Sequence, residues 1–405
     1  MTDTSRQTLL RSLPSSFDTG PQWLRALRVR AADVLREQGL PTKKTETWRF
    51  TPVRSLVDGE FSLTEGAVPS IESSLPKGVT ARSLRQVLQS EPELLKGRLD
   101  LGGAPTDFAA LNTALFSDGL WIDVSAGAVV EAPIELVHAV PDSAQPGVVY
   151  PRVLVTVGDA AEVMLIETYA GKEAGQLTNS VVELDLARNA KMSHVRVHRN
   201  AGSQVGRIDV RQEQDSVYRS TVVTLGGALL RLDVRCLLQG TGAESELNGA
   251  YLVEGQEHVD HHTRVEHQAP RCRSQQTYRG IVSGKGTAVF DGIVIVHRDA
   301  QKTEAHQENR NLLLSDTATV HTKPHLQIDA DDVICSHGAT VGSLDEDQSF
   351  YLRARGIPED LARAMLTYAF LESVVDRVSH EPTRARLSEA VLAQIPRADD
   401  IRDLT

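Results

Sequence analysis

The sequence predicts a mainly β protein whose central core is flanked by an N-terminal and a C-terminal helical domain. Beyond about Leu120, short runs of β-branched residues replace helical spacing, and turn signals such as Gly226-Gly227 separate them. This texture persists for about two hundred residues without a helix-sized amphipathic segment, which favours a sandwich, a barrel or a solenoid. The boundaries that we expect are 1–119 for the N-terminal domain, 120–341 for the β core and 342–405 for the C-terminal domain.

The strand candidates share a high content of Val, Leu and Ile, and the clearest lie at 153–157, 163–167, 181–186, 194–198 and 222–225. No repeat of about 6 to 9 residues is visible among them, so the residues alone do not select the solenoid. Asn309 and Asn311 stand two residues apart in ENRNLLLSD, where their side chains would share one strand face. They fit an amide ladder inside a stacked β-helix and fit ordinary turn chemistry equally well.

The N-terminal region carries two helical patterns. Apolar residues recur at helical spacing from Pro21 to about Gln38, with proline at the start and Gly39 just beyond the end. A second helical segment is expected from about 83 to 99. The connector ETWRFTPVRSL is polar and aromatic, and we interpret its Trp48 and Phe50 as packing residues.

The C-terminal region carries three helical patterns. Ser343 is the expected N-cap of a short helix, with Glu346 as its capping-box partner and Gly356 beyond its end. Pro358 opens a second helix with two neighbouring apolar stripes, which predicts packing on two sides. A third helix is expected from about Thr383 to Ile395.

Composition limits the classes of function. The chain has 405 residues, with 43 Lys and Arg against 54 Asp and Glu, and its net charge of −11 argues against nucleic acid or an anionic membrane as the main partner. The sequence has no membrane-spanning run of about 18 apolar residues and no signal-peptide pattern, so we expect a cytoplasmic protein. Its three cysteines are scattered and form no C-x-x-C pair, which predicts neither a disulfide framework nor a self-contained metal motif.

Common catalytic motifs are absent from the sequence. The nearest approach to a phosphate-binding loop is GIVSGKG at 280–286, which has the wrong spacing and no hydroxyl after Lys285. There is no G-x-S-x-G elbow and no G-x-G-x-x-G turn that enters a helix. We therefore expect no enzyme. The alternative is a cytoplasmic β-helix enzyme that cleaves polysaccharides, whose pair of carboxylates a sequence cannot reveal.

Nine of the thirteen histidines lie between His258 and His337. The segment VDHHTRVEHQ places His261, His262 and His267 near one another, but in strand-like sequence and without the H-E-x-x-H pattern of a zinc hydrolase. Most of these histidines have an ordinary structural or surface role. A stand-alone metal-binding protein that uses the cluster from His258 to His267 is a further hypothesis.

A sharper candidate is DADDVICSHGATVG, at 329–342. If the chain is extended from Val333 to His337, the Cys335 thiol and the His337 imidazole project from the same strand face. Both groups bind iron and iron–sulfur clusters, which usually need four protein ligands. The pair is therefore an accident, a Cys–His catalytic couple, or half of a metal site that another subunit completes.

Long blocks of the second half of the chain resemble the SufB/SufD family of iron–sulfur cluster assembly proteins. They are SQQTYRGIVSGKGTAVFDG, AQKTEAHQENRNLLLSDTA, TKPHLQIDADDVICSHGATVG and LDEDQSFYLRARGI, and ETWRFTPVRSL near the N-terminus is also similar. CSHGATVG resembles the SufD branch, because SufB-type chains typically carry an acidic residue where Gly338 stands. The resemblance implies a right-handed parallel β-helix flanked by helical domains.

The resemblance also implies a role as a scaffold. A member of the SufD branch pairs with a SufB paralogue through the β-helix and docks a SufC ATPase on its C-terminal helices. His337 matches a histidine that helps to hold a transient iron–sulfur cluster shared with SufB at the junction, and Cys335 matches a cysteine beside it. A reduced flavin is associated with the whole complex, but no flavin-binding motif maps onto this chain. Without SufB, an exposed β-helix edge would favour a homodimer.

Overall fold

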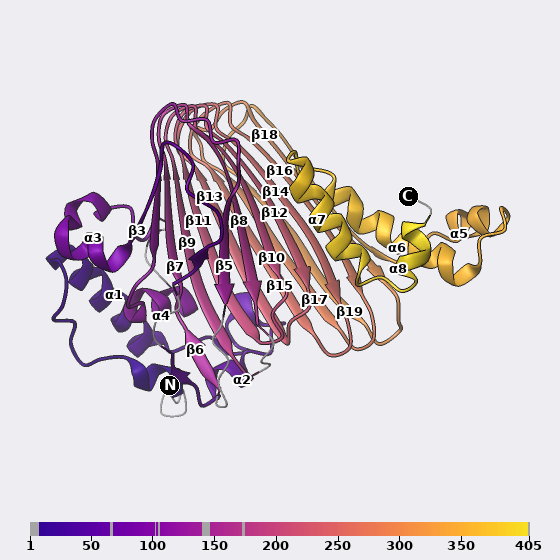
Figure 1. Cartoon of the computed structure of the whole chain (residues 1–405), viewed down its shortest axis with the longest axis horizontal. Coiled ribbons are helices and arrows are strands. Elements are labelled where there is room, and N and C mark those ends of the chain that lie inside the picture. Colours follow the sequence, from indigo (N-terminus) through magenta and orange to yellow (C-terminus); the bar gives the residue numbers. More distant parts are fainter. Residues whose placement is uncertain are drawn as a thin grey trace.

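The protein is a parallel β-helix with helices packed on both of its broad faces (Figure 1). The structure is a computed structural model that describes residues 8–64, 68–101, 103, 106–139, 146–171 and 175–403. Residues 1–7, which belong to the stretch searched for a signal peptide, lie outside the described residues. The predicted fold class, a parallel β-helix core with helices at both ends of the chain, is confirmed, and the sandwich and the barrel are excluded.

Two sheets form the walls of the β-helix, and successive strands of the chain alternate between them. Sheet A contains β3 (Val79–Ser83), β4 (Leu120–Val124), β7 (Arg152–Val157), β9 (Leu177–Leu186), β11 (Ser203–Gln212), β13 (Leu229–Leu238), β15 (His258–His267), β17 (Thr287–Val296) and β19 (Thr319–Ile328), with β1 (Ser62–Leu63) and β6 (Gly147–Val149) at its side. Sheet B contains β2 (Ser70–Ile71), β5 (Ile134–Ala139), β8 (Glu162–Ala170), β10 (Lys191–His198), β12 (Val217–Leu225), β14 (Glu244–Val253), β16 (Arg273–Val282), β18 (Thr303–Leu313) and β20 (Val333–Gly342). The five runs predicted as strands all lie within these elements.

One turn of the β-helix is too long, and too variable in sequence, to be seen as a short repeat. A residue in the left-handed conformation, with φ between 55° and 75°, recurs every 26 to 31 residues at the same corner of the β-helix, as Asn189, Asp215, Gly242, Arg271 and Lys302. The backbone N–H of each donates to a carbonyl of the following turn, as from Asn189 to Gln214 at 2.9 Å. The repeat therefore lies in the backbone geometry, while the residue type at this corner changes from turn to turn.

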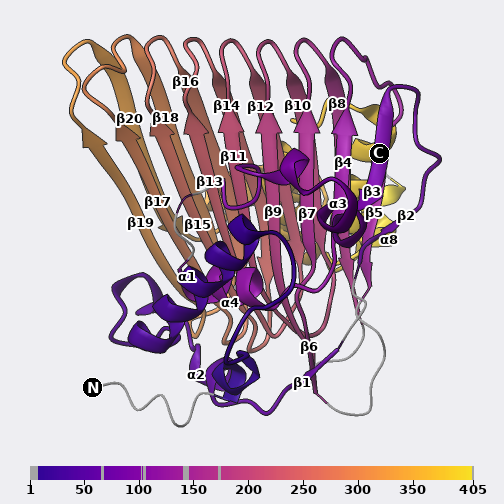
Figure 2. The same ribbon diagram turned by 90° about the vertical axis from the view of Figure 1, so that its left-hand side faces the viewer.

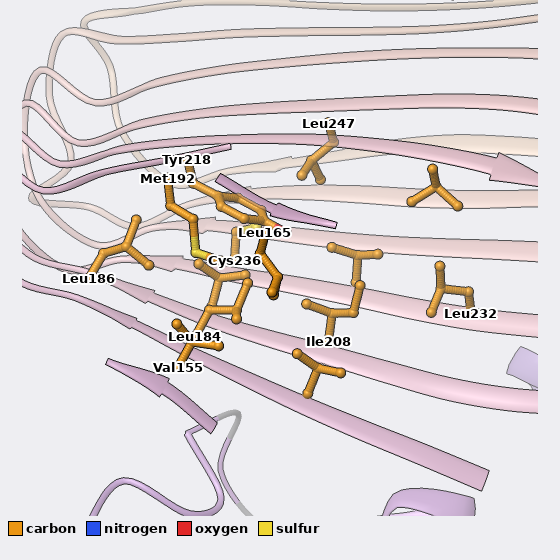
Figure 3. Packing of buried hydrophobic residues seen from close by; sticks show 14 of the residues in the cluster. Val155, Leu165, Leu184, Leu186, Met192, Ile208, Tyr218, Leu232, Cys236 and Leu247 are labelled. Atoms are coloured by element: carbon orange, nitrogen blue, oxygen red, sulfur yellow. The ribbon is translucent and has the colours of Figure 1, made fainter. Parts of the chain in front are cut away.

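Inward-facing side chains of both sheets form a single continuous core. Figure 3 shows Leu184, Ile208 and Leu232 from sheet A, with Leu165 and Leu247 from sheet B, all of which belong to this core. Neighbouring strands pair in register, so equivalent positions of successive turns stack on one another. Each turn thus buries the apolar face of the turn before it.

The helices of the N-terminal region cover the outer face of sheet A (Figure 2). They are α1 (Gln22–Gln38), α2 (Arg54–Val57), α3 (Leu84–Ser90), α4 (Asp107–Leu115) and the 3₁₀ turns η2 (Thr8–Ser12), η3 (Glu46–Trp48) and η4 (Pro92–Leu95). Helix α1 has the predicted bounds, but the single helix predicted from 83 to 99 is wrong. It ends at Ser90 because Pro92 disfavours a helical conformation at Glu91, and the chain continues as the short turn η4.

An arginine fastens the predicted connector to sheet A. The guanidinium of Arg231 on β13 lies 4.1 Å from the centre of the Trp48 ring and donates to the Asp260 carboxylate at 2.7 Å. The same carboxylate accepts a hydrogen bond from Thr51. Trp48 is buried, whereas Phe50 remains exposed and stacks on the His321 ring of β19 at 4.0 Å. Both aromatic residues are packing residues, in line with the interpretation of the sequence.

The C-terminal region contains α5 (Glu346–Arg353), α6 (Glu359–Val375), α7 (Glu381–Leu392) and α8 (Ala398–Arg402). Helices α6 and α7 lie against the outer face of sheet B, whereas α5 projects away from it (Figure 1). Helix α6 packs on two sides as predicted, because Leu371 and Val374 contact sheet B while Leu361 and Ala364 contact the end of the chain. None of the described helices is long and apolar enough to cross a membrane.

Two details of the C-terminal prediction are wrong. The N-cap of α5 is Asp345 rather than Ser343, and its carboxylate accepts hydrogen bonds from the backbone N–H groups of Asp347 and Gln348 at 2.9 and 3.2 Å. A carboxylate at this position also complements the positive end of the helix. Helix α7 begins at Glu381, two residues before the predicted start, because Pro382 is well suited to the first turn of a helix. The domain boundaries stay a prediction, although β3 also joins the N-terminal region to sheet A.

The interior also contains buried polar side chains. Glu167 of β8 lies within hydrogen-bond distance of His138 at 2.7 Å and of His194 at 2.8 Å. Burial opposes ionisation of this carboxyl group, but the two histidine contacts outweigh it and keep its pKa well below the ordinary value. His261 lies between the rings of Tyr251 and Tyr278, and neither of its ring nitrogens has a hydrogen-bond partner among the described residues.

Acid should destabilise the fold through His261. Burial lowers the pKa of His261 to about 4, so the unfolded chain, in which a histidine titrates near pH 6.5, binds a proton more readily. Stability is then fully present above pH 6.5 and is lost as pH falls toward 4. We expect His261→Phe to reduce the loss of unfolding free energy between pH 7.5 and pH 5 by about 2 kcal/mol in urea titrations. An unaltered pH dependence of the unfolding free energy in His261→Phe would contradict the prediction.

Candidate functional site

The β-helix ends in an uncovered turn formed by β19 and β20 (Figure 2). Within the described part of the chain, β19 pairs only with β17 and β20 only with β18, so each leaves one backbone edge free. In earlier turns the inward side chains are fully buried, as Val294 and Val296 are, whereas Ile328 is 39% and Val341 44% exposed. The end of the β-helix is therefore partly apolar and open to a partner.

Cys335 and His337 lie on the inward-facing side of this last turn. Strand β20 is extended as predicted, and its register places Cys335 beside Ala305 and His337 beside Gln307. Ala305 and Gln307 are buried inside the β-helix, so their neighbours on β20 face the same way. Cys335 is a half-buried free thiol that packs against the core, and His337 is exposed.

Over residues 319–342, all of which the structure describes, Cys335 and His337 are the only inward-facing residues with a thiol, imidazole or carboxylate side chain. The inward positions of β20 also hold valine and alanine, and those of β19 hold Val320, Thr322, Pro324, Leu326 and Ile328. An iron–sulfur cluster usually needs four protein ligands, with thiolate and imidazole among the suitable groups. The last turn thus offers two ligands and cannot close a coordination sphere alone.

The geometry does not favour a Cys–His catalytic couple. Burial raises the pKa of the Cys335 thiol above its ordinary value of 9.0, so the thiol is protonated at neutral pH. An activated cysteine needs the opposite shift. No hydrogen bond joins Cys335 to His337 in the described part of the chain.

The structure does not bring the histidines of β15 together. His261 and His267 face the interior, where His267 lies 2.8 Å from the Ser274 hydroxyl. His258 and His262 point to the opposite face, where His262 lies 3.0 Å from an Asp260 oxygen. Among the described residues, no group of three or more His, Cys, Asp or Glu side chains is arranged to hold a metal ion. The hypothesis of a stand-alone metal site on β15 therefore has no geometric support.

The asparagine pair lies inside the β-helix but forms no ladder between turns. The Asn311 amide donates to Asn309 on the same strand at 2.6 Å, and the Tyr251 hydroxyl donates to Asn311 at 2.6 Å. The strand neighbours of the two asparagines are tyrosine, glycine, alanine and valine residues. A ladder contact that the sequence analysis missed joins Gln276 and Gln307, which are register neighbours on β16 and β18. Only the register of turns about thirty residues apart could have revealed it.

A groove of about 800 Å³ lies between α7 and the outer face of sheet B. Its carboxylates are engaged by arginines: Arg386 donates to both Glu135 oxygens at 3.0 and 2.9 Å, and Arg402 donates to Glu389 at 3.2 Å. The hydrogen bond from Arg402 lowers the pKa of Glu389. A glycosidase needs a carboxylic acid that stays protonated near neutral pH, so this groove does not favour the polysaccharide-cleaving alternative.

The structure defines the class of protein as a parallel β-helix whose open last turn carries two metal-binding side chains, too few to complete a metal site. Comparison with known proteins identifies the family. Residues 140–370 match the SufBD core domain of the SUF system for FeS cluster assembly, and residues 68–136 match the SufBD N-terminal region. The chain belongs to the SufBD family of iron–sulfur cluster assembly proteins.

Three relatives are similar over most of their length. A SufBD family iron–sulfur cluster assembly protein of Synechocystis sp. is 31% identical, and the alignment covers 90% of this chain and 89% of the relative. The iron–sulfur cluster assembly protein SufD of Escherichia coli is 30% identical, with 89% and 90% covered. The chloroplastic protein ABCI7 of Arabidopsis thaliana is 33% identical, with 93% and 88% covered.

The open end predicts selective reactivity of Cys335. Cys236 and Cys272 are fully buried, so brief treatment of the native protein with N-ethylmaleimide should add one label, at Cys335. Intact mass spectrometry should find no label on Cys335→Ser and three labels on the unfolded wild-type chain. Two or more labels on the native protein would contradict the uncovered last turn.

Proposed function

We propose that this protein is a scaffold subunit of the Suf iron–sulfur assembly complex. It pairs with a SufB-like paralogue through the open end of its β-helix and docks a SufC-like ATPase on its C-terminal helices. His337, with Cys335 beside it, helps to hold a nascent iron–sulfur cluster at the junction. The cluster is transient cargo shared with the paralogue.

The observation that carries this proposal is the ligand set of the last turn. Cys335 and His337 face inward at an uncovered end, and the other inward residues of 319–342 cannot bind iron as thiolate, imidazole or carboxylate. A half-site at an open surface serves a cluster only if a second subunit brings the missing ligands. A second β-helix would also cover the exposed Ile328 and Val341 and extend the free strand edges.

The C-terminal region supplies the ATPase surface in this proposal. None of the eight residues of α5, all described, is buried, and Phe350 and Tyr351 are 69% and 55% exposed. Adjacent exposed aromatic residues on a projecting helix are typical of an interface. Helix α6 links α5 to sheet B, so movement of a bound ATPase could reach the β-helix.

The same proposal includes expectations about catalysis, location in the cell, flavin and self-association. The chain alone catalyses nothing, it acts in the cytoplasm, and any reduced flavin belongs to the whole complex. In the absence of the paralogue, two copies would pair through their free edges. The net charge of −11 and the local chemistry of the open end support protein partners rather than nucleic acid.

Separate mutations should disrupt the two proposed interfaces independently. Val341→Asp places a carboxylate at the open end, where it would have to leave water on pairing, so affinity for the paralogue should fall at least about tenfold. Phe350→Asp should release the ATPase instead. In pull-downs from cells that express all three subunits, each variant should retain the partner that the other loses.

A control variant tests whether any new surface carboxylate has these effects. Val129→Asp changes another exposed valine, which lies beside Glu162 near the first turns of the β-helix, and this variant should retain both partners. Recovery of neither partner by the wild-type chain would overturn the scaffold proposal and return the enzyme to consideration.

His337→Ala should abolish cluster building without dissolving the complex. The exposed imidazole contributes little to packing, so complex yield should stay normal while cluster absorbance falls at least about tenfold. His325→Ala on β19 is the matched control, since it removes an exposed histidine from the outer face of the same turn. Normal cluster formation by His337→Ala in an intact complex would remove His337 from the site.

A further inference from the structure

His337 ends a column of stacked side chains inside the β-helix. The register aligns Leu247 of β14 with Gln276 of β16, Gln276 with Gln307 of β18, and Gln307 with His337 of β20. All four face the interior, and the three residues before His337 are buried. The imidazole is therefore the exposed member of a column that is otherwise buried.

The two glutamines of this column form a short amide ladder. The Gln307 amide nitrogen donates to the Gln276 side-chain oxygen at 3.2 Å, and the Thr263 hydroxyl donates to the same oxygen at 2.6 Å. These contacts fix Gln276 and one side of the Gln307 amide. The Gln307 side-chain oxygen is buried and has no hydrogen-bond partner within the described residues. In an amide ladder, each side-chain amide donates its N–H to the turn before it and offers its oxygen to the turn after it. In the turn after Gln307, the aligned residue is His337.

A glycine opposite the ladder makes room for Gln307. A Cβ atom added to Gly292 of β17 would lie 2.1 Å from the Gln307 amide nitrogen, closer than two such atoms can approach. The space that Gln307 occupies thus depends on the absence of a side chain at position 292. The position of the Gln307 side-chain oxygen therefore depends on Gln276 and Gly292, which lie far from β20 in sequence.

We propose that Gln307 is a positioning residue for His337. Its side-chain oxygen accepts the N–H of the neutral imidazole, which leaves the other ring nitrogen unprotonated and directed out of the open end toward iron. A neutral histidine carries one N–H, and a metal binds the nitrogen that lacks it. Ligating histidines generally donate their other N–H to an acceptor of this kind. A change of rotamer of the exposed His337 is sufficient, because stacked side chains start about 4.8 Å apart.

The inference rests on the proposed function for the iron, but the hydrogen bond can be tested on the isolated full-length chain. We expect ¹⁵N NMR of the histidine rings at pH 8 to find one dominant tautomer of His337 in the wild type. Gln307→Met removes the acceptor with little change of volume and should move His337 toward the mixture of tautomers found in solution. Gln307→Glu, which keeps an acceptor oxygen, should retain the single tautomer.

Two further variants control for structural effects. Asn309→Leu removes another buried amide from the same face of β18, but its register neighbour is Ala339, so the His337 tautomer should not change. Gly292→Ala displaces Gln307 without altering it and should reproduce the effect of Gln307→Met. If Gln307→Met fails to fold, Gly292→Ala and Gln307→Glu decide the question. An unchanged tautomer in folded Gln307→Met or folded Gly292→Ala would overturn the inference.

Cluster formation in the assembled complex separates this inference from the proposed function. Gln307→Met should lower cluster yield about 10- to 100-fold with complex yield unchanged. Loss of clusters in His337→Ala, together with an unchanged tautomer in Gln307→Met, would overturn the positioning role and leave the scaffold function standing. Normal clusters in His337→Ala would instead remove His337 from the proposed cluster site, whatever the tautomer does.

Discussion

The in-register parallel pairing of successive turns is the constraint on which the rest of this structure depends. Each strand from β7 onward pairs residue by residue with the strand one turn away, so a position that faces inward in one turn faces inward in the next. A slip of one residue would turn a whole apolar face to water. The same constraint that builds the core therefore decides which side chains reach the end of the β-helix.

A β-helix, unlike a closed barrel, has two ends to protect. At the start, β3 and β2 add antiparallel strands to β4 and β5, and the N-terminal helices pack over sheet A. At the other end, β19 and β20 each have one edge that pairs with no further strand among the described residues, and the chain continues into helices that pack on the outer face of sheet B. This asymmetry leaves one surface on which a second subunit can continue the stack.

Local patterns predicted the elements, while contacts between turns could not be predicted. Runs of β-branched residues located the strands, and a period of two placed Cys335 and His337 on one face. That period defines two faces without telling which is inward, so the position of the pair inside the open end required the structure. The register of Gln307 with His337, across thirty residues of chain, leaves no local trace in the sequence.

The proposed cluster site is incomplete because each turn of the β-helix is covered by the next one. The same stacking of turns completes the hydrophobic core. An inward position of an earlier turn is covered by the next turn, so a ligand placed there could not meet another subunit. Only the last turn offers inward side chains to a partner, and its two strands supply one thiol and one imidazole. Behind them the interior holds amides and hydroxyls, which can orient a ligand but bind iron poorly. The division between a buried orienting layer and an exposed ligand layer thus follows from the place where the β-helix stops.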